Sequence, residues 1–263
     1  MNLKIHQVDS FSQDLFKGNP AAVIILERWL DDALMQAIAI ENNLSETAFL
    51  VPLATNYYFI RWFSPICEID FCGHATLAAA HVLFEDNTEA LELRFATSKV
   101  GELSARRAED HLIAMDFPIH PPQSIQEIPD ALLKGVSIQP SKILRNQQAY
   151  FLVYDQQSQV ESIVIDEALI KTLGPYDVVV TAKARDYDFV SRYFWPANGG
   201  YEDPVTGSIY AGLTPYWAAR LGKKKMVAYQ ASNRGGVLHC ALNAQSVTVA
   251  GHATTYMQGT VFM

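Results

Sequence analysis

Two runs of small apolar residues, one in each half of the chain, place the tightest constraint on its fold. They cover residues 74–84 and 208–221, and each follows a glycine, Gly73 or Gly207. A helix formed from either run is apolar nearly all round, and such a helix is stable only when it is buried. We therefore predict that each half of the chain wraps strands around one central helix of small side chains.

The rest of the chain consists mostly of short segments that alternate between apolar and polar residues or are rich in β-branched and aromatic ones. These patterns predict strands at residues 4–8, 22–26, 47–51, 57–63, 91–95, 102–106, 111–117, 149–154, 177–182, 188–194, 226–230, 236–242 and 246–251. Two further helices are expected, at residues 31–42 with Asp31 or Asp32 as N-cap, and at residues 167–173. Many strands with few, irregularly placed helices favour an α+β fold over a doubly wound parallel sheet.

A weak internal repeat indicates two similar lobes. Phe63-Ser64-Pro65 precedes the first buried helix, and Phe194-Trp195-Pro196 precedes the second. A proline-rich stretch at residues 117–122 interrupts the strands near the middle of the chain, because proline fixes φ and cannot donate to a strand ladder. We predict an N-terminal lobe over residues 1–117 and a C-terminal lobe over residues 118–254.

Composition excludes several classes of protein. The chain has 263 residues, 49% of them hydrophobic and 18% charged, which is typical of a globular protein. Its net charge of -8 argues against nucleic-acid binding, which needs a basic surface. No run approaches the roughly 18 apolar residues of a membrane span, and residues 1–9 lack the pattern of a secretory leader. Three cysteines at no zinc spacing fit a reducing cytoplasm, so a cytoplasmic protein without membrane or metal is expected.

The first polar motif in apolar surroundings contains Glu46. This residue stands between the predicted helix at residues 31–42 and the predicted strand at residues 47–51. A carboxylate beside an apolar strand loses hydration, which makes it a better proton shuttle near neutral pH. The competing interpretation is an ordinary surface glutamate in a turn.

The second motif is Cys72-Gly73-His74, at the start of the first buried helix. The exposed N–H groups of a helix start can hold a carboxylate, Gly73 allows a close approach, and His74 can donate to the same anion or relay a proton. The competing interpretation is a helix start with a packed histidine. Cys72 is expected to be structural, although a helix N-terminus lowers the pKa of a thiol.

The third motif runs from Glu202 to Ser208, at the start of the second buried helix. Thr206 or Ser208 can cap that helix, Gly207 and Ser208 again offer N–H groups, and Asp203 can act as a second acid/base or orient His74. The competing interpretation is a simple turn and cap. Two such helix starts in two similar lobes imply a shared cleft in which a small acid would lie between both ends.

Together these motifs resemble the PhzF-like (phenazine biosynthesis-like) family of isomerases and epimerases. The matching segments are Val8–Phe11, Gly18–Val23, Asn42–Phe49, Cys72–Ala80, Glu202–Ser208 and Gln230–Gly236. They occur in order over nearly the whole chain. The resemblance implies a diaminopimelate epimerase-like fold, with two lobes that are each a barrel-like sheet around a central helix. It also implies that the last strand, about residues 255–263, returns to the N-terminal lobe, and that the active site lies in the cleft between the lobes.

The resemblance assigns roles to single residues. Glu46 matches the catalytic base of the family, and His74 and Asp203 match its assisting polar pair. Gly73 and Ser208, with Gly207 beside it, match the cradle for the substrate carboxylate. The implied chemistry removes a proton from one carbon and returns it to another without metal or organic cofactor. In phenazine-making relatives the substrate is a dihydro-hydroxyanthranilate.

The chain departs from the family pattern in two places near the second buried helix. Relatives often carry Ala-His-Cys after the Gly-Ser pair, whereas this chain has Ile209-Tyr210-Ala211, which either reshapes the pocket or only repacks the helix. Related epimerases use a cysteine at each of the two helix starts, but the position that matches Cys72 is Thr206. A racemase mechanism with two thiols is therefore not expected.

Three hypotheses follow from the sequence. The first is a cofactor-independent isomerase acting on a small carboxylated metabolite. The second is an amino-acid epimerase or racemase of the same fold, with Cys72 or Glu46 and Asp203 as its two bases. The third is a non-catalytic protein that binds a small molecule. A homodimer is expected from the family resemblance.

Overall fold

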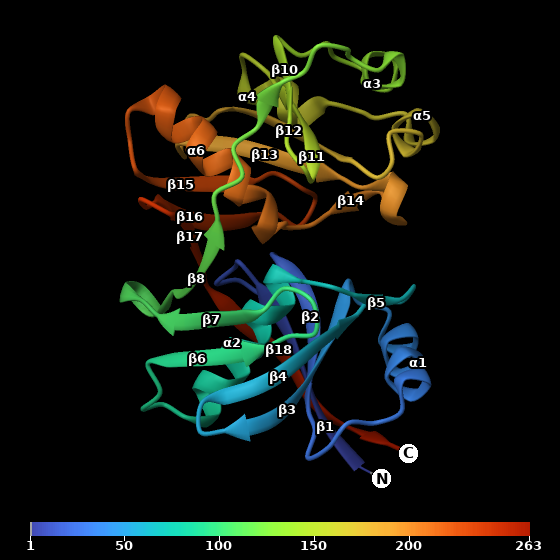
Figure 1. Ribbon diagram of the computed structural model, residues 1–263, viewed down its shortest axis with the longest axis vertical. Helices are drawn as coiled ribbons and strands as arrows, with labels where there is room; N and C mark the ends of the chain where they lie inside the picture. The colour runs from blue at the N-terminus through green and yellow to red at the C-terminus, as the bar shows by residue number, and fades with distance from the viewer. Residues whose placement is uncertain (1) are drawn as a thin grey trace. The chain divides into compact units, whose positions relative to one another are not determined.

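The computed structural model describes residues 2–263, and the chain divides into two compact units (Figure 1). Unit 1 comprises Met1–Asp116 and Ala250–Met263, and unit 2 comprises Phe117–Val249. Both units combine a mixed sheet with helices, so the chain is an α+β protein, as predicted. Within residues 2–263, no helix is both long enough and apolar enough to cross a membrane.

Unit 1 is built on a mixed sheet in the order β18-β1-β2-β3-β4-β6-β7-β8, with β2 parallel to β3 and β4 parallel to β6. Its strands are β1 (Asn2–Ser10), β2 (Asn19–Ile25), β3 (Glu46–Ala54), β4 (Tyr57–Phe63), β5 (Glu68–Ile69), β6 (Glu92–Ala96), β7 (Glu102–Arg107), β8 (Ile113–Pro118) and β18 (Ala253–Phe262). Its helices are α1 (Asp32–Asn42), the short η1 (Glu109–His111) and α2 (Gly73–Asp86).

The central helix of unit 1 is α2, as the apolar run predicts. It packs against β1, β2, β3, β7 and β18, and the sheet curls around it (Figure 1). Eleven of its fourteen residues are buried, so the small side chains of the run allow the strands to approach closely. The N-cap of α1 is Asp31, whose Oδ1 accepts from Ala33 N at 2.9 Å, so Asp32 is not the cap.

Unit 2 repeats this pattern of pairing, with β11 parallel to β12 and β13 parallel to β15. Its strands are β9 (Gln123–Ser124), β10 (Lys142–Arg145), β11 (Ala149–Val153), β12 (Asp177–Lys183), β13 (Phe189–Phe194), β14 (Glu202–Asp203), β15 (Lys225–Gln230), β16 (Gly236–Leu242) and β17 (Ser246–Gly251). Its helices are α3 (Asp130–Lys134), α4 (Gln157–Ser162), α5 (Glu167–Lys171), α6 (Tyr210–Leu221) and the short η2 (Pro196–Asn198) and η3 (Gly207–Ile209).

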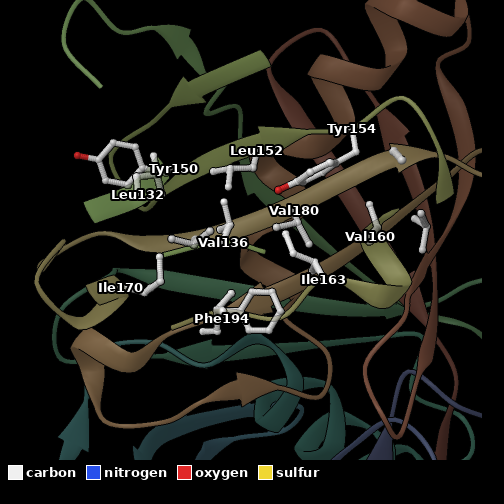
Figure 2. Packing of buried hydrophobic residues seen from close by; sticks show 14 of the residues in the cluster. Leu132, Val136, Tyr150, Leu152, Tyr154, Val160, Ile163, Ile170, Val180 and Phe194 are labelled. Carbon is white, nitrogen blue, oxygen red and sulfur yellow. The ribbon is translucent and has the colours of Figure 1, made fainter. Parts of the chain in front are cut away.

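The two crossover helices confirm the repeat that the sequence indicated. Helix α2 connects the parallel strands β4 and β6, and α6 connects the parallel strands β13 and β15. Phe63 and Phe194, the first residues of the two Phe-x-Pro segments, end β4 and β13. One face of the unit 2 sheet carries a cluster of buried apolar side chains that includes Leu152, Val180 and Phe194 (Figure 2).

Candidate active site

Glu46 is placed by the turn between α1 and β3. Helix α1 ends at Asn42 and is followed by its C-cap, Asn43, which adopts the left-handed conformation at φ 48, one that asparagine tolerates better than most residues. The chain then enters β3 with Glu46 as its first residue, aligned with Ala21 of the parallel strand β2. The Glu46 side chain is only 10% exposed. The alternative of a surface glutamate in a turn is therefore wrong.

His74 lies beside this carboxylate, in the first turn of α2. Its Nε2 is 2.8 Å from Glu46 Oε2, and its side chain is only 7% exposed. This is an ion-pair distance, but the alignment is not that of a hydrogen bond, so Oε2 is buried without a hydrogen-bond partner. A buried acceptor of this kind is rare in folded proteins, and it leaves Oε2 available for a proton from a ligand.

Asn19, the first residue of β2, controls the other side of the histidine ring. Ser45 Oγ donates to Asn19 Oδ1 at 2.9 Å, which turns the Asn19 amide group toward His74 Nδ1 at 3.1 Å. The Asn19 Nδ2 group then donates a hydrogen bond to His74 Nδ1. A neutral His74 therefore carries its hydrogen on the other ring nitrogen, Nε2, which faces Glu46. Gly18 permits this placement of Asn19, because its φ is +65° and a Cβ atom there would lie 2.1 Å from Ser10 O.

The charges around His74 raise its pKa well above the ordinary value of 6.5. Burial acts to lower this pKa, but the interactions of the ring with Cys72 and Glu46 outweigh it. The thiol of Cys72 itself has a pKa raised to about 11, through burial first and the nearby Glu46 second. Cys72 is therefore a neutral thiol near pH 7, and Glu46 is the group that supplies negative charge to His74 there.

The expectation that the helix N-terminus lowers the pKa of the Cys72 thiol is therefore wrong, because this pKa is raised. Its Sγ caps α2 by accepting from Ala75 N at 3.4 Å, and burial outweighs the favourable effect of the helix end. A neutral, buried thiol is a poor base and a poor nucleophile. This agrees with the expectation that Cys72 is structural.

Glu46, Cys72 and His74 each also offer one potential metal ligand, and these atoms lie within 4.8 Å of one another. The sulfur lies nearer to His74 Nδ1, at 3.4 Å, than to Nε2, at 3.8 Å, whereas the carboxylate faces Nε2. The contact between the carboxylate and Nε2 also suits the transfer and holding of a proton.

Asp203 lies in unit 2, at the end of the short strand β14. Thr206 Oγ1 donates to its Oδ2, and its backbone carbonyl accepts from Gln230 Nε2 at 2.9 Å. The same Gln230 side chain accepts from Thr206 N at 3.0 Å through Oε1, and it is completely buried. Gln230 thus holds both ends of the Asp203–Thr206 turn. This contact links two of the family-like segments, Glu202–Ser208 and Gln230–Gly236.

Ser208 lies in η3, directly before α6, and it is half-buried. Its Oγ accepts from Gln148 Nε2 at 2.9 Å. Neither Ser208 nor Thr206 caps the helix, contrary to the prediction, because both hydroxyls have other partners in the loop. Gly207 is buried beside Ser208, at the first position of η3.

The residues at which the chain departs from its relatives pack in the interior of unit 2. Ile209 and Tyr210 are both completely buried. Tyr210 OH lies 3.0 Å from Ser191 Oγ, and its ring lies 5.9 Å from that of Phe189. Both side chains therefore contribute to the packing around the start of α6.

The structure thus gathers Glu46, Gly73 and His74 in unit 1, and Asp203, Gly207 and Ser208 in unit 2. Neither Asn19 nor Gln148 was predicted to have a role at the site. For Asn19 a signal existed, because it lies in one of the family-like segments directly after Gly18. Gln148 stands in none of those segments, and its contact with Ser208 spans 60 residues.

Two repeated sheet-and-helix units, with a buried carboxylate and histidine at one helix start, form an arrangement that fits an enzyme of the isomerase class. The family model described as phenazine biosynthesis-like protein matches residues 8–259. The chain is 47% identical over 264 residues to an uncharacterized isomerase of Pseudomonas aeruginosa, with 100% of both chains covered. The protein therefore belongs to the phenazine biosynthesis-like (PhzC-PhzF) family.

Solved structures agree with this assignment. A PhzF family protein of Enterococcus faecalis matches with a TM-score of 0.94 and 40% identity, over 100% of both chains. A hydroxyproline epimerase of Agrobacterium vitis, solved with bound trans-4-hydroxy-L-proline, matches with a TM-score of 0.63 over 99% of this chain and 92% of that one. At 11% identity the second likeness shows the shared epimerase-like fold alone.

Proposed function

We propose that this isomerase moves a proton between two carbons of a small carboxylated metabolite without a cofactor, and that Glu46 is its general acid/base. The observation that supports this role is the buried Oε2 atom of Glu46, which has no hydrogen-bond partner and lies 2.8 Å from His74 Nε2. An acceptor that is held out of water and does not accept a hydrogen bond from the protein suits the removal of a proton from carbon.

The reaction balances without oxidant or reductant. Glu46 takes a proton from a carbon next to a double bond, and the electron pair of that C–H bond shifts along the conjugated system. The protonated Glu46 then returns the proton to a second carbon, which moves the double bond and restores the carboxylate. The Nε2–H of His74 faces the carboxylate and stabilises it before the first step and after the second.

The remaining residues receive supporting roles in this proposal. Gly73, at the start of α2, and Gly207 with Ser208, before α6, are assigned to hold the carboxylate of the substrate. Backbone N–H groups and hydroxyls at helix starts suit such an anion. Asp203 is assigned as the second acid/base. The family resemblance supports these roles, and single substitutions test each of them.

An epimerase is the second candidate. The protonation state of Cys72 argues against an epimerase mechanism that uses this thiol as a base. A two-base epimerase needs a base on each face of one carbon, but Cys72 is a neutral thiol with a pKa of about 11. The two reactions also leave different products. Epimerisation labels and inverts one carbon, whereas isomerisation places the label on a second carbon.

The test is hydrogen exchange in heavy water. Purified protein is incubated with a panel of small carboxylic metabolites, including a dihydro-hydroxyanthranilate, and deuterium on carbon is followed by mass spectrometry and NMR. Glu46→Gln should lower the labelling rate by about 10²–10⁴-fold, since a general base contributes that much. Glu41→Gln is the matched control, because Glu41 is exposed on α1 and should label at the wild-type rate. Equal labelling by both variants would exclude Glu46 as the base.

A further inference from the structure

A chain of hydrogen bonds in unit 2 links a half-buried carboxylate, that of Asp177, to the hydroxyl of Ser208. Tyr193 OH donates to Asp177 Oδ2 at 2.6 Å. Gln148 Nε2 donates to Tyr193 OH at 3.0 Å and to Ser208 Oγ at 2.9 Å. The four residues come from β12, β13, the turn before β11 and η3, so the fold brings together positions that lie far apart in the sequence.

The chemistry of each member fixes the direction of these hydrogen bonds. Asp177 accepts at both oxygens, since Asn198 Nδ2 donates to Oδ1 at 2.8 Å while Tyr193 donates to Oδ2. The single hydroxyl hydrogen of Tyr193 is donated to Asp177, so Tyr193 OH can only accept a hydrogen bond from Gln148. The amide nitrogen of Gln148 has two hydrogens and no lone pair to offer, and it gives one to Tyr193 and one to Ser208.

Ser208 therefore has a hydrogen that Gln148 cannot accept. Its oxygen already accepts from Gln148, and its own hydrogen cannot point back at an amide that only donates. The hydroxyl hydrogen must point elsewhere. A ligand group facing Ser208 meets a hydrogen-bond donor, which is the arrangement that suits a carboxylate oxygen.

The position of Gln148 in this chain is fixed by its own backbone. Gln148 N donates to Asn146 Oδ1 at 2.8 Å, and Gln148 O accepts from Asp177 N at 3.1 Å. Asn146 in turn donates from Nδ2 to His120 O at 3.0 Å. The Gln148 amide thus extends from an anchored turn, which a positioning residue requires.

We infer that Gln148 is a positioning residue that turns the hydrogen of Ser208 toward the ligand, and that it thereby favours a substrate carboxylate, which is the stronger acceptor, over a neutral amide at this position. The inference rests on the proposed function, in which Ser208 holds the substrate carboxylate. Tyr193 and Asp177 fix the orientation of the Gln148 amide, because Tyr193 OH donates to Asp177 and therefore accepts only from the Nε2 side of the amide.

The direction of the chain can be measured without a ligand. A neutron crystal structure of the deuterated protein locates the hydrogens on Tyr193, Gln148 and Ser208. We expect the deuterium of Ser208 to point away from Gln148, and that of Tyr193 to point at Asp177. A deuterium on Ser208 that points at Gln148 would overturn the inference.

Selectivity is measured with anthranilate and its neutral amide, 2-aminobenzamide, by isothermal titration. Wild type should bind the carboxylate in preference to the amide. In Gln148→Glu the new carboxylate accepts from Ser208, so its hydrogen turns away from the ligand. This preference should fall by about tenfold or more, since a hydrogen bond to a charged group is lost. Gln147→Glu adds the same charge at the exposed neighbouring position and should keep the wild-type preference.

The possible failures are distinguishable. If Gln148→Glu and Gln147→Glu keep the same preference while Ser208→Ala loses it, Ser208 holds the carboxylate but Gln148 does not position it, and the inference is wrong. If Ser208→Ala also keeps the preference, or wild type has none, the role of Ser208 in the proposed function fails. Thermal melting of each variant separates these results from a loss of folding.

Discussion

Glu46 and His74 form a buried pair in which the histidine is supported on both sides. The carboxylate lies 2.8 Å from Nε2, and Asn19 lies 3.1 Å from Nδ1. The negative charge of one member favours the positive charge of the other, so a change in Glu46 must be visible in His74. This coupling gives a test of the site that needs no substrate.

The first prediction concerns the titration of His74. Replacing Glu46 with glutamine removes the charge that opposes the effect of burial, so the pKa of His74 should fall from its raised value. Imidazole ¹⁵N chemical shifts, followed by NMR from pH 5 to pH 9, report this pKa directly. The exposed control Glu41→Gln should leave the titration unchanged. An identical His74 titration in wild type and Glu46→Gln would show that the carboxylate does not act on the ring.

The same coupling predicts how stability depends on pH. The folded pKa of His74 lies above its ordinary value of 6.5, so its contribution is fully present below pH 6.5 and is lost as the pH rises through the folded pKa. The free energy of unfolding of wild type, relative to Glu46→Gln, should therefore be largest near pH 6 and shrink toward pH 9. Urea titrations at several pH values measure this difference, and a difference that grows with pH would contradict the assignment.

The third prediction concerns the three thiols. Cys67 is exposed, whereas Cys72 and Cys240 are buried, with pKa values raised by burial to about 11 and about 12. A thiol reagent such as Ellman's reagent at pH 8 should titrate Cys67 quickly in the native protein, and the other two only after unfolding. Cys67→Ser should abolish the fast phase. A fast reaction at Cys72 would reopen the possibility that its thiol acts as a base.

Periodicity predicted most elements of the fold because their burial follows the sequence pattern. Residues 57–63, 236–242 and 246–251 are strands with the same limits as predicted. The helix α4 was not predicted, because Val160 is its single buried residue and no apolar stripe marks it. Periodicity also missed β18, which is mostly exposed or half-buried and is held by its pairing with β1. For β18 the information lies in the partner strand.

The candidate site shows the same division between local and distant information. Glu46 and His74 stand next to apolar segments with turn and helix signals, so their importance was visible locally. Asn19 acts on His74 across 55 residues, and Gln148 acts on Ser208 across 60 residues. Nothing in the local sequence of a single asparagine or glutamine specifies such a partner. The failed prediction of a Thr206 or Ser208 cap has the same cause. The Thr206 hydroxyl bonds to Asp203 in the turn, and the Ser208 hydroxyl bonds to the distant Gln148.

The fourth prediction tests the support of the Asp203 turn. Gln230→Leu keeps the volume of the side chain roughly constant, but it leaves the backbone N–H of Thr206 and the carbonyl of Asp203 without their partner. Each buried unsatisfied group costs about 1–3 kcal/mol, so the free energy of unfolding should fall by at least that amount. Gln123→Leu, at an exposed position of the same unit, should change it by less than about 0.5 kcal/mol. Equal effects of the two substitutions would show that Gln230 does not hold the turn.

The last prediction concerns Arg192, whose guanidinium ties α4 to β14. It forms a two-pronged ion pair with Glu202, with Nε 2.7 Å from Oε1 and Nη2 3.0 Å from Oε2, and both side chains are less than 15% exposed. Its Nη1 also donates to three carbonyls at the end of α4, those of Val160, Glu161 and Ile163.

Arg192→Lys keeps the charge but replaces this planar fork with a single ammonium, which cannot reach the carboxylate and the carbonyls together. We expect a loss of about 1–3 kcal/mol in the free energy of unfolding, measured by urea denaturation. Arg106→Lys is the matched control, because Arg106 and its partner Asp116 are each 38% exposed and such pairs contribute at most about 1 kcal/mol. Because Glu202 directly precedes Asp203, a loss limited to Arg192→Lys would show that the fork also stabilises the strand that carries this candidate acid. Equal, small losses in both variants would mean that the carbonyls of α4 do not depend on Arg192.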